Sequence, residues 1–215
     1  AVGHDISWPQ CDKGLPDVGA FGIVGVTGGR PYTRNACLSS QFAWAEASPG
    51  GAGFYMNTSN PGVDSLAVDW YAQRSPDPAC APGNEVACAY DFGFNAAAEA
   101  FAYAQESTGR SIGRVWWLDV EFDNSWSDDI AANRASIQGS VDYLQRQPGV
   151  VVGVYSTPRM WNRLMGDHRL PLANWTAGAN TLEEAMAHCS PAFSATGGPV
   201  VLSQWVEDFD NDFVC

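Results

Sequence analysis

The segment Arg114-Val-Trp-Trp-Leu-Asp-Val-Glu-Phe122 decides the fold, because it is a hydrophobic strand that ends on two carboxylates, Asp119 and Glu121. Alternate residues of a strand face opposite sides of a sheet, so Val115, Trp117 and both acids share one face, and the other face is wholly apolar. The segment therefore predicts a strand that is buried on both sides and presents two acids on one of them.

These two acids need a reason to be there. An ionised carboxylate away from water costs free energy unless it is paired or put to use. By the rise of a strand the two residues are about 6–7 Å apart. Such a pair suits cleavage of a glycosidic bond, in which one carboxyl protonates the leaving oxygen and the other stabilises or attacks the sugar cation. Asp-x-Glu is also a short pattern, and solvated charges at a sheet edge, or partners of an arginine or a metal, remain alternatives.

Strands and helices alternate along the chain. Beside the strand at 114–122, hydrophobic patterning predicts strands at 2–8, 21–26, 53–57, 150–155, 170–175 and 199–205, with a weak eighth strand near Phe193. Helices are predicted at 37–46, 94–104, 158–165 and 181–188, with another from Ser127 up to Pro148 and a possible one at 64–73. Such alternation predicts an α/β fold, an irregular TIM-like (β/α) barrel of about seven to eight strands, with a doubly wound open sheet as the alternative. No GxGxxG or P-loop pattern favours the open sheet.

Length and composition restrict the function. The chain of 215 residues fits one domain, residues 1–215, and its 46% hydrophobic content is ample for a core. Its formal charge of −13 disfavours nucleic-acid binding, which needs a basic surface. No hydrophobic run is long enough for a membrane span, so we expect no membrane insertion. We expect a monomer that acts on a polysaccharide without a cofactor or metal.

Six cysteines occur without a CxxC pair or a zinc-like Cys/His cluster, and three disulfides are therefore predicted. Six cysteines permit fifteen connectivities in principle. Neighbourhood in the sequence favours Cys11–Cys37, Cys80–Cys88 and Cys189–Cys215. Disulfides persist in oxidising compartments, so we expect a secreted, extracellular protein with Ala1 as the end left after export.

The carboxyl ends of barrel strands carry the chemistry of barrel enzymes. Acids, amides and aromatic residues stand at the predicted strand ends, a composition that suits a groove for sugars better than a phosphate site. Asp119 and Glu121 are the candidate catalytic residues. The candidate substrate-binding residues are Asp5, Trp8, Tyr55, Asn57, Tyr155, Trp175, Gln204, Trp205 and Asp210.

Some residues at or near the strand ends suit a purely structural role as well. Tyr55 and Trp117 fit the core as well as they fit a groove, because aromatic rings fill cores routinely. The late acid of the site is either Asp210 or Asp212. The alternating acids Asp208, Asp210 and Asp212 could hold calcium, but the loop glycine and distal glutamate of an EF-hand are missing, so no metal site is predicted.

Taken in their order along the chain, the strand ends resemble those of the family-25 glycoside hydrolases, the N-acetylmuramidase type of lysozyme. The pieces that carry the resemblance are Asp5-Ile-Ser7-Trp8, Leu118-Asp-Val-Glu121, Val152-Gly-Val-Tyr-Ser156 with Trp161, and Ser203-Gln-Trp205 followed by Asp210 or Asp212. They span nearly the whole chain. The resemblance implies an incomplete (β/α) barrel that cleaves β-1,4 links between N-acetylmuramic acid and N-acetylglucosamine in peptidoglycan.

The resemblance also implies roles for the acids. Glu121 would be the general acid, and Asp119 would stabilise the cation or orient the substrate's acetamido group. Asp5 and the late acid would hold the substrate or tune Glu121. The chain departs from the family pattern at Thr27-Gly28-Gly29, which lacks an acid, at Tyr55-Met56-Asn57, which replaces a His-Phe ending, and at Ser203, which replaces a tryptophan. A hydrolase of another wall polysaccharide and a non-catalytic glycan-binding barrel therefore remain alternatives.

Overall fold

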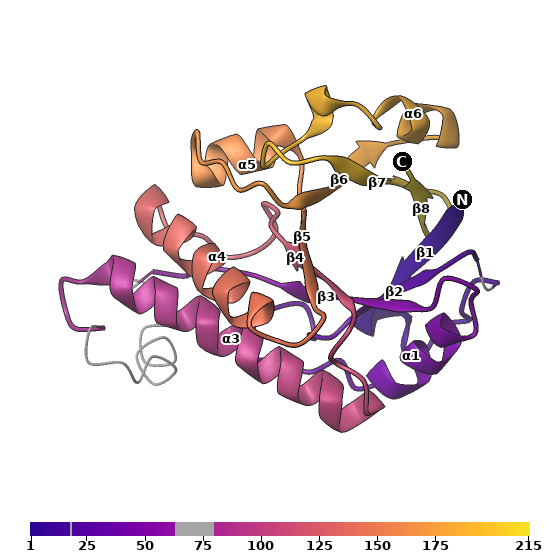
Figure 1. Ribbon diagram of the computed structural model, residues 1–215, viewed down its shortest axis with the longest axis horizontal. Helices are drawn as coiled ribbons and strands as arrows, with labels where there is room; N and C mark the ends of the chain where they lie inside the picture. The colour runs from indigo at the N-terminus through magenta and orange to yellow at the C-terminus, as the bar shows by residue number, and fades with distance from the viewer. Residues whose placement is uncertain (18, 63–79) are drawn as a thin grey trace.

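The computed structural model describes residues 1–17, 19–62 and 80–215, so the possible helix at 64–73 lies outside the described residues. Eight strands form a closed barrel in sequence order (Figure 1). They are β1 (Val2–Ile6), β2 (Gly22–Gly25), β3 (Ala52–Asn57), β4 (Val115–Asp119), β5 (Val151–Tyr155), β6 (Ala173–Ala179), β7 (Val200–Val206) and β8 (Asp210–Val214). Neighbours from β1 to β7 pair in parallel, which confirms the predicted barrel.

Helices surround the barrel on its outer side (Figure 1). They are α1 (Leu38–Glu46), α3 (Glu85–Thr108), α4 (Ile130–Gln145), α5 (Pro158–Met165) and α6 (Leu182–Ala187), with short 3-10 helices η1 (Trp8–Gln10) and η2 (Pro191–Phe193). Side-chain caps fix several of their first turns. Asp129 accepts hydrogen bonds from the backbone N–H groups of Ala131 and Ala132 at the start of α4. Thr181 caps α6, as its position before the predicted helix indicated.

The barrel has two apolar layers because its strands alternate. Trp116 and Leu118 point outward and pack with the helices in the main core. Trp117 points inward and packs with Trp175 inside the barrel. A Cβ on Gly153 would lie 2.2 Å from the Trp117 ring, so this glycine makes the room that the indole fills. The two faces expected for the segment at 114–122 are present from Val115 to Asp119, but the strand ends there, and Phe122, which was expected on the buried apolar face, is 43% exposed.

The eighth strand is not where the sequence indicated. The region near Phe193 forms η2, and the strand that closes the barrel is β8, which pairs antiparallel with both β7 and β1. The predicted strand at 170–175 is also shifted. Pro171 has no N–H to donate, so Leu170 makes only an isolated bridge to Gly197, and β6 begins at Ala173.

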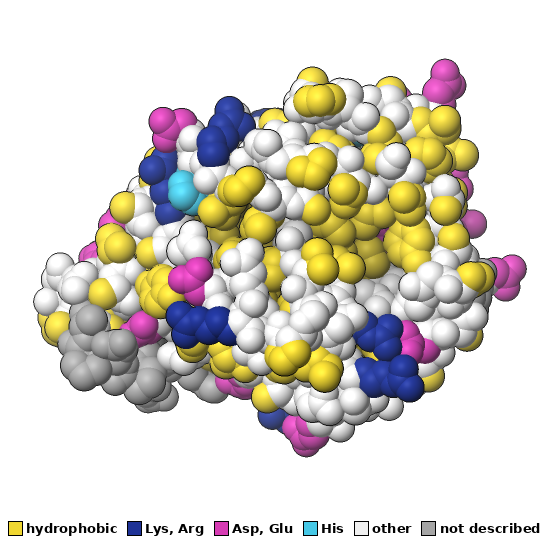
Figure 2. Space-filling view, viewed as in Figure 1, with side chains coloured by type: hydrophobic (Ala, Val, Ile, Leu, Met, Phe, Trp, Pro, Cys, Tyr) yellow, Lys and Arg dark blue, Asp and Glu magenta, His cyan; other side chains and the backbone are white. Residues whose placement is uncertain are grey.

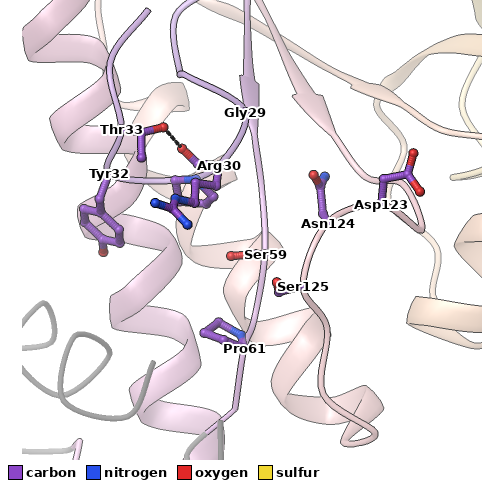
Figure 3. Close-up of a pocket in the computed structure, with 10 residues that line it drawn as sticks. Gly29, Arg30, Tyr32, Thr33, Ser59, Pro61, Asp123, Asn124 and Ser125 are labelled. Carbon is purple, nitrogen blue, oxygen red and sulfur yellow. Dashed lines mark hydrogen bonds between the residues drawn. The ribbon is translucent and has the colours of Figure 1, made fainter. Parts of the chain in front are cut away.

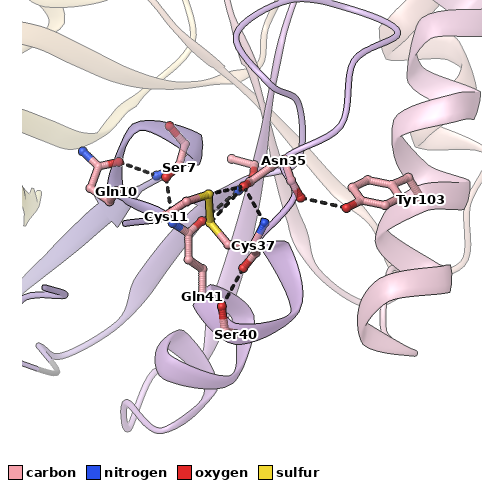
Figure 4. The surroundings of a disulfide bond; sticks show 9 residues. Ser7, Gln10, Cys11, Asn35, Cys37, Ser40, Gln41 and Tyr103 are labelled. Carbon is pink, nitrogen blue, oxygen red and sulfur yellow. Dashed lines mark hydrogen bonds between the residues drawn. A yellow bond between two sulfur atoms is a disulfide. The ribbon is translucent and has the colours of Figure 1, made fainter. Parts of the chain in front are cut away.

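All three predicted disulfides are present, namely Cys11–Cys37, Cys80–Cys88 and Cys189–Cys215. The first lies in a polar cluster around Asn35 (Figure 4). The Asn35 side-chain amide donates to the carbonyl of Gly25 and to Oε1 of Gln41, both at 2.7 Å. Gln41 in turn donates to the carbonyl of Ser7. This cluster therefore fixes the carboxyl ends of β1 and β2 relative to each other.

Hydrophobic side chains are distributed unevenly over the surface. On the face shown in Figure 2, hydrophobic side chains gather around strands β7 and β8. An apolar hollow of about 300 Å³ lies at the amino ends of the strands, where Val115 and Val214 are part of its lining.

Within residues 1–17, 19–62 and 80–215, no helix combines the length and hydrophobicity that a membrane crossing requires. Among the same residues, no three His, Cys, Asp or Glu side chains are grouped as ligands for a metal ion.

Candidate active site

The carboxyl ends of the strands surround a hollow of about 280 Å³. Most of the predicted site residues line this hollow. They belong to several different strands or directly follow a strand. The lining consists of Asp5, Tyr55, Asp119, Glu121, Tyr155, Trp175, Gln204, Val206 and Asp210. Four carboxyl groups therefore share one small cavity.

Asp119 is the last residue of β4, and its side chain is buried at the wall of this hollow. Its Oδ2 accepts a hydrogen bond of 2.5 Å from Nδ2 of Asn57, and Asn57 is held in turn by the hydroxyl of Thr27 at 2.7 Å. The other oxygen, Oδ1, is buried without a hydrogen-bond partner among the described residues. Burial and the nearby Glu121 raise the pKa of Asp119 well above its usual range. Asn57 therefore fixes one oxygen of Asp119, and the other makes no hydrogen bond to a described residue.

Glu121 lies two residues further on, just beyond the end of β4, and is partly exposed to solvent. Its pKa is raised first by burial and then by the negative charges of Asp123 and Asp210. Asp123 was not among the predicted site residues. A carboxyl whose pKa is raised stays protonated closer to neutral pH, so Glu121 has the property that a general acid needs.

A second pair of acids lies below the hollow. Asp212 is fully buried, and its Oδ1 accepts a hydrogen bond of 2.7 Å from the indole nitrogen of Trp175. Its other oxygen, Oδ2, is buried without a hydrogen-bond partner among the described residues. Two buried carboxyls that interact as Asp5 and Asp212 do resist being ionised together. Burial, together with the charge of Asp5, holds the pKa of Asp212 well above its usual range.

Asp5 is in turn connected to the opposite wall. Burial, followed by the charge of Asp210, raises its pKa to about 8. Its Oδ2 accepts a hydrogen bond of 2.8 Å from Nε2 of Gln204, and Oε1 of Gln204 accepts one of 2.8 Å from the hydroxyl of Tyr155. Hydrogen bonds therefore connect Asp5 of β1, Gln204 of β7 and Tyr155 of β5.

Aromatic rings form the floor and one wall. Tyr155 and Trp175 meet edge to face with centroids 4.6 Å apart, and Trp117 meets Trp175 at 5.7 Å. Trp175 and Trp117 are only 2% and 3% exposed, so both are core residues of the barrel interior more than open platforms for a sugar ring. Tyr155 is partly exposed and offers a hydroxyl and a ring edge to the hollow.

The structure does not bring every predicted residue to the hollow. Trp205 points to the outer side of β7 and packs with Ala179 and Ala185, because its neighbour Gln204 points inward. Trp8 is half exposed on η1 and lies outside the lining. Asn57 lies behind Asp119 and contacts it directly. Strand alternation could have excluded Trp205 from sequence alone.

The sequence left open whether Asp210 or Asp212 is the late acid of the site. Both side chains point to the inner side of β8. Asp210 lines the hollow, and Asp212 is buried beneath it. Asp208 lies outside β8 and is exposed.

A larger hollow of about 590 Å³ adjoins the acids (Figure 3). The loop at 29–33 borders it on one side, Ser59 and Pro61 lie beneath, and Asp123 to Ser125 face the loop from the end of β4. Asn124 also belongs to this border and donates to the backbone carbonyl of Asp119 at 3.0 Å. The concave surface therefore continues beyond the acidic hollow.

Solved structures share this architecture. A bacterial lysozyme from Streptomyces coelicolor superposes with a TM-score of 0.61 at 16% identity, covering 99% of this chain and 91% of that one. This chain shares its fold with a lysozyme. The catalytic domain of endolysin ply40 from the Listeria monocytogenes bacteriophage P40 matches with a TM-score of 0.50 at 14% identity over 100% and 92% of the two chains. The autolysin LytC of Streptococcus pneumoniae, solved with a synthetic peptidoglycan ligand, matches with a TM-score of 0.57 at 16% identity over 98% of this chain and 45% of LytC.

These likenesses establish the fold. No protein-family model matches the chain, and no curated protein sequence matches it either.

Proposed function

We propose that the protein is a secreted glycoside hydrolase that cleaves the glycan of bacterial peptidoglycan as a β-1,4-N-acetylmuramidase. The observation that carries the proposal is the position of Asp119 and Glu121 in one acidic hollow at the carboxyl end of a barrel with the lysozyme fold. The LytC structure with a peptidoglycan ligand supports the substrate class, and the three disulfides support an extracellular location.

Glu121 acts as the general acid in this proposal. Its raised pKa and partial exposure suit a group that gives a proton to the glycosidic oxygen and regains one from water. The leaving sugar departs as an alcohol, and positive charge develops on the anomeric carbon of the other sugar.

Asp119 acts on that developing charge. Its free Oδ1 either accepts a hydrogen bond from the N–H of the substrate's acetamido group, which then attacks the anomeric carbon, or stabilises the cation directly. Asn57 and Thr27 hold the carboxyl group in place. Asp5 and Asp210 bind sugar hydroxyls or tune the neighbouring acids, and Tyr155 and Gln204 complete the wall. The chain acts as a monomer and needs no cofactor.

A hydrolase of a different wall polysaccharide is the second candidate. The departure at Asn57 favours it, because Asn57 ends β3 and bonds directly to Asp119, so a different residue there would change which sugar substituents fit. The reaction class would be the same.

Product analysis distinguishes these candidates. The protein is incubated with purified peptidoglycan and, separately, with other bacterial wall polysaccharides, and the released fragments are read by mass spectrometry after borohydride reduction. A muramidase leaves muramic acid at the new reducing end. Glucosamine ends, or cleavage of another glycan alone, would contradict the muramidase assignment.

The variant Glu121→Gln serves as the matched control, because the amide has nearly the same shape and cannot donate the proton. We expect cleavage to fall by a factor of about 1,000 with an unchanged circular-dichroism spectrum. A variant that cleaves as fast as the parent would remove Glu121 from the acid role. If no polysaccharide in the panel is cleaved but one binds, the barrel is a binding module.

A further inference from the structure

A third hollow, of about 570 Å³, lies on the outer flank of the segment that follows β4. Phe122 and Trp126 line it from that segment, and Arg159 and Arg163 line it from α5. Glu121 lines the acidic hollow and its neighbour Phe122 lines this one, so the two sites are separated by a single peptide unit.

Two arginines distinguish this hollow from the acidic one. Arg159 and Arg163 are four residues apart on one helix, so they lie on the same side of α5. Neither is buried, and neither forms an ion pair with another residue of the described chain. The protein carries a net charge of −13, and the neighbouring hollow is lined by four acids. Two unpaired cations at this position are suited to an anionic group.

Apolar and polar residues share the remaining lining, and the polar ones are Ser127, Asn133 and one acid. Phe122 is 43% exposed and Ile130 39% exposed, and Leu164 and Trp126 complete the apolar walls. Asp128 also reaches the hollow. Unsubstituted sugars have no group that requires the two arginines, and a sugar-phosphate polymer has no aliphatic part for these walls. A short peptide with carboxylates, alkyl side chains and an amine matches all three kinds of surface.

We propose that this hollow binds the acidic peptide that peptidoglycan carries on its muramic acid, and that the protein therefore prefers peptide-bearing glycan. The inference rests on the proposed function and names a second recognition site for the same substrate. The arginines bind the peptide carboxylates, the apolar walls cover its aliphatic side chains, and Asp128 pairs with its amine.

The hollow is also linked to the proposed acid. The indole nitrogen of Trp126 donates a hydrogen bond of 2.8 Å to the backbone carbonyl of Glu121. A peptide that packs on Trp126 therefore restrains the backbone on which Glu121 is carried. Arg159, Arg163 and Trp126 are positioning residues in this account, since none of them touches the reacting bond.

The test compares two forms of one substrate. Soluble peptidoglycan strands with their peptides intact, and the same strands after an amidase has removed the peptides, are given to the parent and to the double variant Arg159→Gln, Arg163→Gln. The control is Arg110→Gln, Arg146→Gln. It removes the same charge at the helix ends near the amino side of the barrel, where Arg110 makes only a 3.4 Å ion pair with Glu46 and Arg146 stacks on Phe94.

We expect kcat/KM of the double variant to fall about tenfold on peptide-bearing strands and to stay unchanged on peptide-free strands. The control should match the parent on both substrates. An equal loss in the control, or an equal loss on peptide-free strands, would show general charge attraction and contradict the peptide site.

The two proposals fail in different ways. If the parent cleaves peptide-free strands at least as well as peptide-bearing ones, the peptide site is wrong and the hydrolase assignment stands. If neither form of the glycan is cleaved, the proposed function itself is wrong.

Discussion

Asp119 and Glu121 lie two residues apart but in different environments. Asp119 is buried and bonded to Asn57, whereas Glu121 is partly open to solvent and close to Asp123 and Asp210. Two carboxyls in unlike surroundings can perform unlike tasks, one as a fixed group and one as a proton donor. The proposed division of labour follows from this difference.

We expect Asp119→Asn to lower kcat by at least about 100-fold, because the amide keeps the shape of the side chain and loses the negative charge that faces the cation. The substitution leaves an acceptor for the Asn57 amide and removes a buried carboxyl of raised pKa, so the free energy of unfolding at neutral pH should not fall. Initial rates on the glycan and urea unfolding measure the two quantities. Full activity in the variant would make Asp119 a structural acid.

The charge of Asp123 raises the pKa of Glu121, and this makes a prediction for the pH profile. A general acid loses activity as the pH rises through its pKa, so the alkaline limb of kcat/KM reports Glu121. Asp123→Asn removes a negative neighbour and lowers that pKa. We expect the alkaline limb to move to lower pH, with the maximal rate nearly unchanged. A limb that stays in place would exclude Glu121 as the titrating acid.

At the scale of the elements, strand patterning predicted the inner and outer faces of β4 and missed β8 altogether. Asp210 and Asp212 resemble a solvated tail in the sequence, yet they alternate with Asn211 and Phe213 along β8. These acids are buried only because the site surrounds them, so their sequence pattern does not indicate a strand. The late acids were therefore predicted to belong to the site, but the strand that carries them was not predicted.

Helices α3 and α4 pack unusually closely at two glycines. A Cβ on Gly139 would lie 2.1 Å from the carbonyl oxygen of Tyr90, and one on Gly93 would lie 1.8 Å from that of Ser136. The hydroxyl of Ser140 also donates to the carbonyl of Gly93 at 2.9 Å. Backbone lies against backbone here, so no flexible side chain can move aside.

We therefore expect Gly139→Ala to lower the free energy of unfolding by about 1–3 kcal/mol, as overpacking does in cores. Urea unfolding measures the change. Gly14→Ala is the control, because a Cβ there would meet nothing within 4 Å and should alter stability by less than about 0.5 kcal/mol. Equal stability of the two variants would mean that the helices can separate without cost.

For the molecule as a whole, the buried acids link stability to pH. The pKa of Asp5 is raised to about 8, and those of Asp119 and Asp212 are raised well above their usual range. A carboxyl with a raised folded-state pKa contributes stability that is fully present below about pH 4 and is lost as the pH rises through the folded value. The pKa of Glu46 is lowered by Arg114, so the stability that Glu46 contributes is lost as the pH falls. This opposes the trend only below the usual pKa of Glu46.

The melting temperature should therefore fall as the pH rises from about pH 5, and the fall should level off above the pKa of Asp5, which is about 8. Calorimetry across this range measures it, and Asp5→Asn should flatten the curve. A melting temperature that rises steadily over the range would show that the acids ionise without strain. The same linkage predicts that a ligand that neutralises the site stabilises the folded protein most at alkaline pH.

The antiparallel β8 brings both ends of the chain to the amino side of the barrel, where the N–H of Val214 donates to the carbonyl of Ala1. The acids lie at the opposite end. A short peptide linker could therefore join residue 215 to residue 1 without crossing the groove, and the circular chain could be opened again at an exposed turn. Fusion partners attached at either original end would likewise leave the mouth of the barrel accessible to a polymer.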